Sequence, residues 1–151
     1  MALLDQTAAT GDIDPTDYDA IYFTGGHGVM WDFPDSAGLQ AITRAIWERG
    51  AIVSAVCHGY CGLLSTRLSN GRLLVEGCRL TGFSWIEEIG VGVARYMSCN
   101  AETEMKRRGA RYGKALLPFV SHVVTDGRMV TGQNPGSAKE TARQVAGLLR
   151  Q

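Results

Sequence analysis

Two short apolar runs separated by an amphipathic segment dominate the first third of the chain. Residues 20–23 (AIYF) and 52–56 (IVSAV) are rich in β-branched and aromatic side chains, and glycine-containing turns follow both. Between them, apolar residues recur at helical spacing from Leu39 to Ile46, and Gly50 stands where glycine commonly closes a helix. The pattern predicts strand, helix and strand, the unit that places two strands parallel in one sheet.

Downstream of the second strand, the pattern predicts shorter elements. Residues 59–66 are expected to form a helix, and the apolar stretch after the Asn-Gly turn at 70–71 suits a strand or short hairpin. Residues 85–93 are compatible with a helix. Residues 101–112 are expected to form a polar surface helix that closes near Gly109.

The C-terminal region predicts a hairpin and a final helix. Two short apolar segments flank Asp126 and Gly127, a strong turn signal. Ser137 is expected to cap the last helix. Its inward-facing residues are expected to be Val145, Leu148 and Leu149. Residues 1–16 lack such periodicity and are expected to form an irregular lead-in, so residues 1–151 are predicted to be a single α/β domain.

Composition excludes several classes of function. Of the 151 residues, 45% are hydrophobic and 20% charged, as in ordinary globular proteins. Fifteen basic and fifteen acidic side chains cancel, so we expect neither nucleic acid nor a membrane surface as a partner. No basic-then-apolar leader is apparent, and the default expectation is a cytoplasmic location in which the four cysteines are free thiols.

The stretch AIVSAVCHGYCGLL places a cysteine where the second strand should meet a helix. Such an elbow turns the side chain of Cys57 outward at the carboxyl edge of the sheet, and a helix N-terminus there favours thiolate. Gly59 and Gly62 allow close backbone approach. A buried core cysteine is the simpler alternative. The adjacent His58 and a second glycine-rich turn at 24–28 favour a nucleophile.

Four motifs in order carry a family resemblance. DYDAIYFTGGHG, AVCHG, LTGFSWIEE and DGRMVTGQNPGSA closely resemble the ThiJ/PfpI superfamily, in particular the branch of glutathione-independent glyoxalases (glyoxalase III) and related holding chaperones. The resemblance covers nearly all of residues 17–151 and implies a flavodoxin-like α/β sandwich with a mainly parallel sheet and a nucleophile elbow.

The resemblance also implies a catalytic triad of cysteine, histidine and an acidic residue. Cys57 takes the nucleophile position, His58 the base position and Glu88, rather than Glu87, the acidic position. The backbone N–H groups of Gly26 and His58 are candidates for an oxyanion hole.

No cofactor or metal is expected at this site. The Cys-x-x-x-Cys spacing from Cys57 to Cys61 lacks a second ligand pair, and Cys61 should face the core. His27 is interpreted as a structural residue that caps its turn, and His122 as positional, although family members carry a histidine there.

The resemblance fails at the N-terminus. Family members begin well before the first strand predicted here and carry an N-terminal glutamate that hydrogen-bonds the cysteine, which residues 1–16 do not supply. We therefore expect an N-terminally truncated family domain whose uncovered sheet either self-associates, as a homo-oligomer such as a dimer, or depends on a further segment.

The leading functional hypothesis is a cofactor-independent lyase that converts methylglyoxal, a small aldehyde, to lactate through Cys57. Three alternatives stay open: a holding chaperone or stress protein, a cysteine amidase or peptidase, and an inactive truncated relative. The sequence does not choose the substrate.

Overall fold

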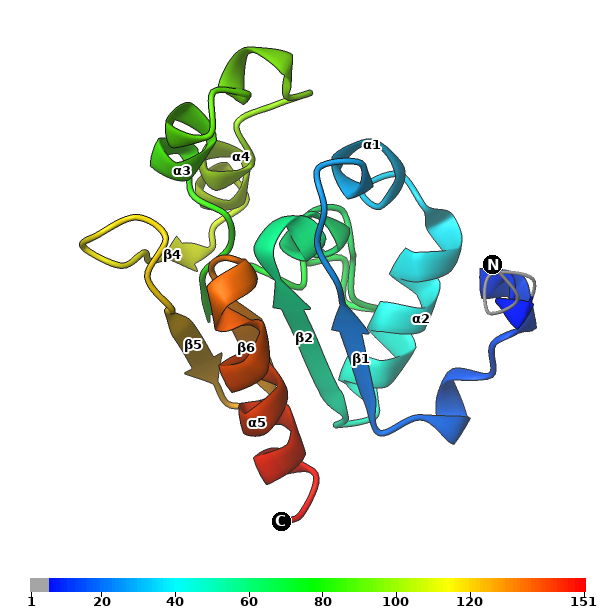
Figure 1. Cartoon of the computed structure of the whole chain (residues 1–151). Helices are drawn as coiled ribbons and strands as arrows, with labels where there is room; N and C mark the ends of the chain where they lie inside the picture. The colour runs from blue at the N-terminus through cyan, green and yellow to red at the C-terminus, as the bar shows by residue number, and fades with distance from the viewer. Residues whose placement is uncertain (1–5) are drawn as a thin grey trace.

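The computed structural model describes residues 6–151 and contains a four-stranded sheet (Figure 1). Its strand order is β1 (Ala20–Phe23), β2 (Ile52–Val56), β6 (Met129–Gly132) and β5 (Val123–Asp126). The first three strands run parallel, and β5 pairs antiparallel with β6. This mixed α/β architecture confirms the predicted fold class, and β1, β2 and the hairpin of β5 and β6 lie where the sequence predicts them.

Side chains of successive strand residues alternate between two cores. Ile21, Phe23, Val53 and Ala55 contribute to a large core that includes residues of α2 (Ala37–Glu48). The intervening positions of the strands pack with Val145 of α5 (Ala138–Leu148) in a second core. Because both faces of the central strands are buried, these strands read as continuous apolar runs.

Local signals position the two helices. The Ser36 side chain accepts a hydrogen bond from the Leu39 N–H at 3.3 Å, and Gly50 adopts a φ of +93° just beyond α2, as the sequence predicts. Ser137 occupies the N-cap position of α5, but the expected side-chain cap is absent, because its Oγ accepts instead from the His122 N–H. Val145 is buried, as expected. The prediction that Leu149 faces inward is wrong: it follows the last turn of α5 and is 51% exposed.

The remaining elements are short. They are α1 (Val29–Asp32), α3 (Trp85–Gly90), α4 (Ala101–Arg107), and the parallel two-residue pair β3 (Arg79–Leu80) and β4 (Arg111–Tyr112). The expected surface helix over 101–112 is corrected in two respects. It ends at Arg107, because Gly109 (φ +85°) redirects the chain into β4, and one side of it is buried through Ala101 and Met105.

The segment after β2 differs from its prediction. Residues 59–66 were expected to be an α-helix, whereas Cys57–Leu63 forms a 3₁₀ helix whose residues are all buried. Close packing limits this segment: a Cβ on Gly59 would lie 2.3 Å from the carbonyl oxygen of Phe23. A backbone this close to β1 leaves no room for side chains at that position, and the segment is shorter and tighter than an α-helix.

Ahead of β1, the chain forms short 3₁₀ turns at Thr10–Asp12 and Pro15–Asp17. The first five residues of the expected lead-in lie outside the described residues. No helix within residues 6–151 has the length and apolar character needed to cross a membrane.

Candidate active site

Cys57 lies at the carboxyl end of β2 in a left-handed backbone conformation. Its φ is +57°, which is uncommon for a residue other than glycine. The neighbouring turn after β1 approaches so closely that a Cβ on Gly25 would lie 2.7 Å from the Cβ of Cys57. The two glycine-containing turns therefore converge on one point, as the sequence predicts.

A hydrogen-bonded chain leads away from the thiol. The Sγ of Cys57 is 3.3 Å from Nδ1 of His58, and Nε2 of His58 is 2.5 Å from Oε1 of Glu88. The side chains of His58 and Glu88 are almost fully buried. The structure thus brings together the three side chains that the sequence singles out, in the order sulfur, imidazole, carboxylate.

Glu88 owes its position to its neighbour Glu87, in the first turn of α3. The buried carboxylate of Glu87 accepts hydrogen bonds of 2.7–3.0 Å from five groups. These donors are the N–H and Oγ of Ser84, the N–H of Phe119, and the side-chain amides of Gln133 and Asn134. Glu87 therefore joins α3 to the 115–120 loop and to the end of β6, while Glu88 turns toward His58.

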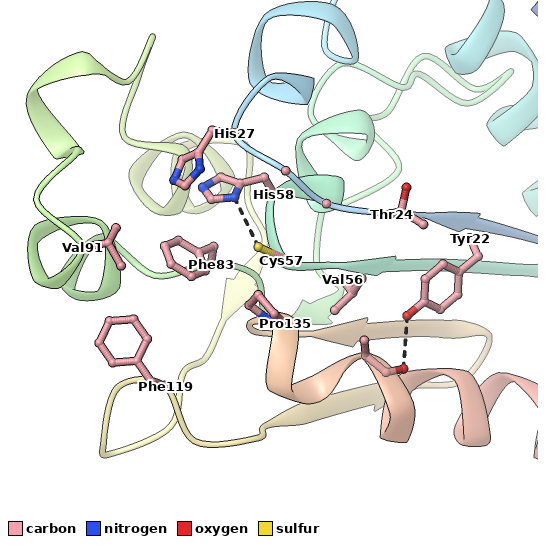
Figure 2. Close-up of a pocket in the computed structure, with 13 residues that line it drawn as sticks. Tyr22, Thr24, His27, Val56, Cys57, His58, Phe83, Val91, Phe119 and Pro135 are labelled. Carbon is pink, nitrogen blue, oxygen red and sulfur yellow. Dashed lines mark hydrogen bonds between the residues drawn. The ribbon is translucent and has the colours of Figure 1, made fainter. Parts of the chain in front are cut away.

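His27 is a member of the cluster that the sequence interpretation missed. Its Nε2 lies 3.2 Å from Oε2 of Glu88, so the carboxylate contacts two imidazoles. The ring of His58 packs against those of His27 and Phe83, with centroid distances of 4.3 and 4.6 Å, and the His27 and Phe83 centroids are 6.1 Å apart. Figure 2 shows the two histidine rings side by side. The interpretation of His27 as a turn cap overlooked Glu88, 61 residues further along the chain.

A cavity of about 620 Å³ opens beside these residues. Its wall includes Cys57, His58 and His27 on one side, and Phe83, Val91 and Phe119 on another (Figure 2). Cys57 itself is only 7% exposed, so the expectation of an outward-facing, exposed sulfur needs correction. The thiol is buried in the protein but borders the cavity.

Burial governs the protonation of the thiol. It raises the pKa of Cys57 to about 11, against the opposing effect of hydrogen bonds from the backbone N–H groups of His58 and Gly26. The expectation that a helix N-terminus stabilises thiolate is therefore wrong, because a short 3₁₀ helix offers little dipole to offset desolvation. Burial likewise lowers the pKa of His58, although Glu88 acts in the opposite direction.

The other residues considered from sequence fall into two groups. The N–H groups of Gly26 and His58 both donate to the sulfur, and their role as an oxyanion hole stays a prediction. Cys61 is buried in the large core, as expected. His122 lies in the segment leading to β5, where its N–H donates to Ser137 Oγ and its carbonyl accepts from Gln133.

Residues 3–147 match the DJ-1/PfpI family, and the chain belongs to it. The chain is 38% identical over 141 residues to Glyoxalase 3 of Candida albicans, covering 89% of this chain and 59% of that protein. It is 37% identical over 138 residues to Glutathione-independent glyoxalase HSP31 of Saccharomyces cerevisiae, covering 87% and 57%. The chain thus spans less than two thirds of the length of these relatives.

Solved structures give the same picture. The crystal structure of glyoxalase III from Candida albicans superimposes with a TM-score of 0.87 at 36% identity, covering 91% of this chain and 60% of that chain. Rapid Encystment Protein 24 KDa from Francisella tularensis superimposes with a TM-score of 0.89 at 34% identity, covering 93% and 62%. These neighbours confirm the flavodoxin-like arrangement and the family resemblance.

Proposed function

We propose that the chain carries the catalytic site of a glutathione-independent glyoxalase, with Cys57 as nucleophile, His58 as base and Glu88 as the residue that orients His58. The observation that carries the proposal is the unbroken chain of contacts from Sγ to Nδ1 and from Nε2 to the carboxylate. With Nε2–H donating to Glu88, Nδ1 is left as the acceptor for the thiol proton. The names of the relatives support the choice of reaction.

The chemistry uses only groups at this site and water. The sulfur of Cys57 adds to the aldehyde carbon of a 2-oxoaldehyde, and His58 transfers the thiol proton to the aldehyde oxygen, giving a hemithioacetal. A proton then leaves this carbon and one returns to the neighbouring carbonyl carbon, so that the first carbon is oxidised to a thioester and the second reduced to an alcohol. Water cleaves the thioester, releasing the 2-hydroxy acid and the thiol. The N–H groups of Gly26 and His58 stabilise the oxyanion at carbon 1.

Lactate formation from methylglyoxal in the absence of glutathione tests the proposal. Replacing Cys57 by Ala should lower turnover on the order of 10³-fold or more, because no other thiol borders the site. Cys78→Ser is the matched control, since Cys78 lies outside the cavity wall, and should retain turnover. Absence of turnover in the unaltered chain, or turnover that survives Cys57→Ala, contradicts the proposal.

A holding-chaperone function is a second candidate, favoured by exposed apolar residues at the cavity mouth. We define the apolar rim as Ile86, Ile89, Val91, Leu116, Leu117, Phe119 and Val120, all of them exposed. Leu116 and Leu117 are 97% and 63% exposed, and such surface can bind unfolded chains. Light scattering of an aggregating client tests this: protection should survive Cys57→Ala and fall in a Leu116→Ser/Leu117→Ser variant. Protection unchanged in the double variant rules out the rim.

A further inference from the structure

Three side chains meet at one point behind the thiol. Each of His27, His58 and Glu88 offers a ligand atom, and these atoms lie within 4.8 Å of one another. Two imidazoles and one carboxylate are a common ligand set for zinc and for other first-row divalent ions. The Cys57 thiol lies at the opposite nitrogen of the His58 ring and takes no part in this group.

The distances suit a small cation. Two ligands of a tetrahedral zinc ion, each at roughly 2.1 Å, are about 3.4 Å apart. The observed 3.2 Å from His27 Nε2 to Glu88 Oε2 is close to this separation. The 2.5 Å from His58 Nε2 to Glu88 Oε1 is a hydrogen-bond distance, and an ion entering there replaces the proton and widens the gap. The widest separation among the three ligand atoms, up to 4.8 Å, has to close by about 1.4 Å.

Burial supplies both a dry site and a route to it. The His58 and Glu88 side chains are almost fully buried, whereas the His27 side chain is 43% exposed and belongs to the cavity wall. An ion can therefore reach the carboxylate from the cavity, and His27 can adjust to it. His58 cannot rotate freely, because its side chain is buried and its ring packs against those of His27 and Phe83.

We propose that His27, His58 and Glu88 bind one zinc-type divalent cation, and that this ion switches the site off. A neutral imidazole that binds metal through Nε2 carries its proton on Nδ1. The proton that His58 shares with Glu88 moves to Nδ1, which then donates toward the Cys57 sulfur. With Nδ1 protonated, His58 no longer accepts the thiol proton. The blocking effect rests on the proposed function, whereas binding stands on geometry alone.

Metal binding is measured on the chelator-treated chain without substrate. Isothermal titration with Zn²⁺ should give one site, and Co²⁺ should give the visible absorption of a low-symmetry nitrogen and oxygen site without a thiolate charge-transfer band. Cys57→Ala should bind as the unaltered chain does. His27→Asn should weaken binding at least about tenfold. His122→Asn is the matched control, because His122 is the third histidine of the chain and lies outside the cluster.

The outcomes separate this inference from the proposed function. Absence of binding, loss of binding in Cys57→Ala, or equal loss in His27→Asn and His122→Asn overturns the site; circular dichroism establishes that each variant is folded. Long-range ¹H–¹⁵N NMR of the imidazoles should place the His58 proton on Nδ1 at saturating Zn²⁺ and return it to Nε2 after excess chelator. Binding that leaves the His58 signals unchanged overturns the switch. Both readouts hold even if the chain forms no lactate.

Discussion

At the scale of single residues, Cys57 combines unusual backbone geometry with an unusual environment for its thiol. Its positive φ lets the side chain leave β2 toward His58 rather than continue along the strand. The same placement buries the sulfur beside two carboxylates, and burial raises its pKa to about 11. At neutral pH Cys57 is therefore a thiol, and under the proposed function the thiolate forms only when His58 takes the proton.

The pH dependence of Cys57 alkylation tests this protonation state. We expect the iodoacetamide rate to climb with pH up to about 11, since the thiolate fraction increases until the pH exceeds the raised pKa. At pH 7 the rate should be on the order of 100-fold below that of an unperturbed thiol. The alkylation is carried out in the presence of chelator, so that no metal ion occupies the site. Mass spectrometry then identifies the modified residue. A rate that levels off below pH 8 contradicts the prediction.

Backbone strain at Cys57 predicts a trade between stability and activity. Left-handed conformation costs a residue with a Cβ about 1 kcal/mol, a cost that glycine does not bear. Cys57→Gly should therefore be more stable than Cys57→Ala by about 1 kcal/mol in urea unfolding, although neither has a nucleophile. Equal stability of the two variants, or a more stable Ala variant, shows that the conformation is unstrained.

Sequence reasoning predicted some residues of the site better than others. Cys57 and His58 are adjacent, so one strand followed by one turn places both, and Glu88 followed from the family resemblance. His27 was misread because its partner Glu88 is distant in sequence, and no local pattern reports that contact. The burial of the thiol was missed for the same reason: it depends on the packing of both glycine-containing turns and Phe83 around it.

At the scale of elements, Glu87 joins parts of the chain that are distant in sequence and that no local sequence pattern links. Strands β1 and β2 were predictable from short apolar runs followed by glycine-containing turns, and β5 and β6 from the turn signal at Asp126 and Gly127. The 3₁₀ form of Cys57–Leu63 was not, because it depends on contact with β1. The five hydrogen bonds of Glu87 likewise bring together residues from 84 to 134.

The ionised carboxylate of Glu87 is expected to contribute to the free energy of unfolding in a pH-dependent way. Burial raises the pKa of Glu87, but hydrogen bonds from Ser84, Asn134 and Phe119 outweigh it and hold the pKa below its ordinary value. The charged form is thus favoured in the folded state, so its stabilisation is present above the unfolded pKa and is lost as pH falls through the folded pKa.

Glu87→Gln should lower the free energy of unfolding by about 2–3 kcal/mol at pH 7, because it puts an amide donor among donors. The deficit relative to the unaltered chain should shrink as pH falls below about 4. Urea unfolding at several pH values measures both effects. Glu140→Gln, at a half-buried position in the first turn of α5, is the control and should change stability little. A pH-independent deficit contradicts the role of ionised Glu87.

At the scale of the whole molecule, the cavity joins the catalytic candidates to the apolar rim. Val91 and Phe119 belong to both the cavity wall and the rim, and they lie on the far side of the cavity from the histidines (Figure 2). The amide of Phe119 is held by Glu87, while a Cβ on Gly90 would lie 3.0 Å from its ring. These contacts hold Phe119, and with it one end of the rim, at the wall of the cavity.

The rim predicts self-association. Single exposed apolar residues are normal on a monomer, but the rim has seven of them on a chain of 16.3 kDa, which indicates a contact surface. A second copy of the chain is the partner that is always present in a pure sample. Sedimentation equilibrium should give twice the chain mass, with Leu116→Ser/Leu117→Ser shifting the equilibrium toward the monomer at least about tenfold. Tyr18→Ser is the control, because Tyr18 is also exposed but lies beside the N-terminal end of β1, away from the rim.

A compact monomer at 100 µM, on the order of the concentrations at which weak dimers form, refutes the prediction. A dimer that withstands the double variant moves the contact from the rim to the open edge of β1, the outer strand of the described sheet.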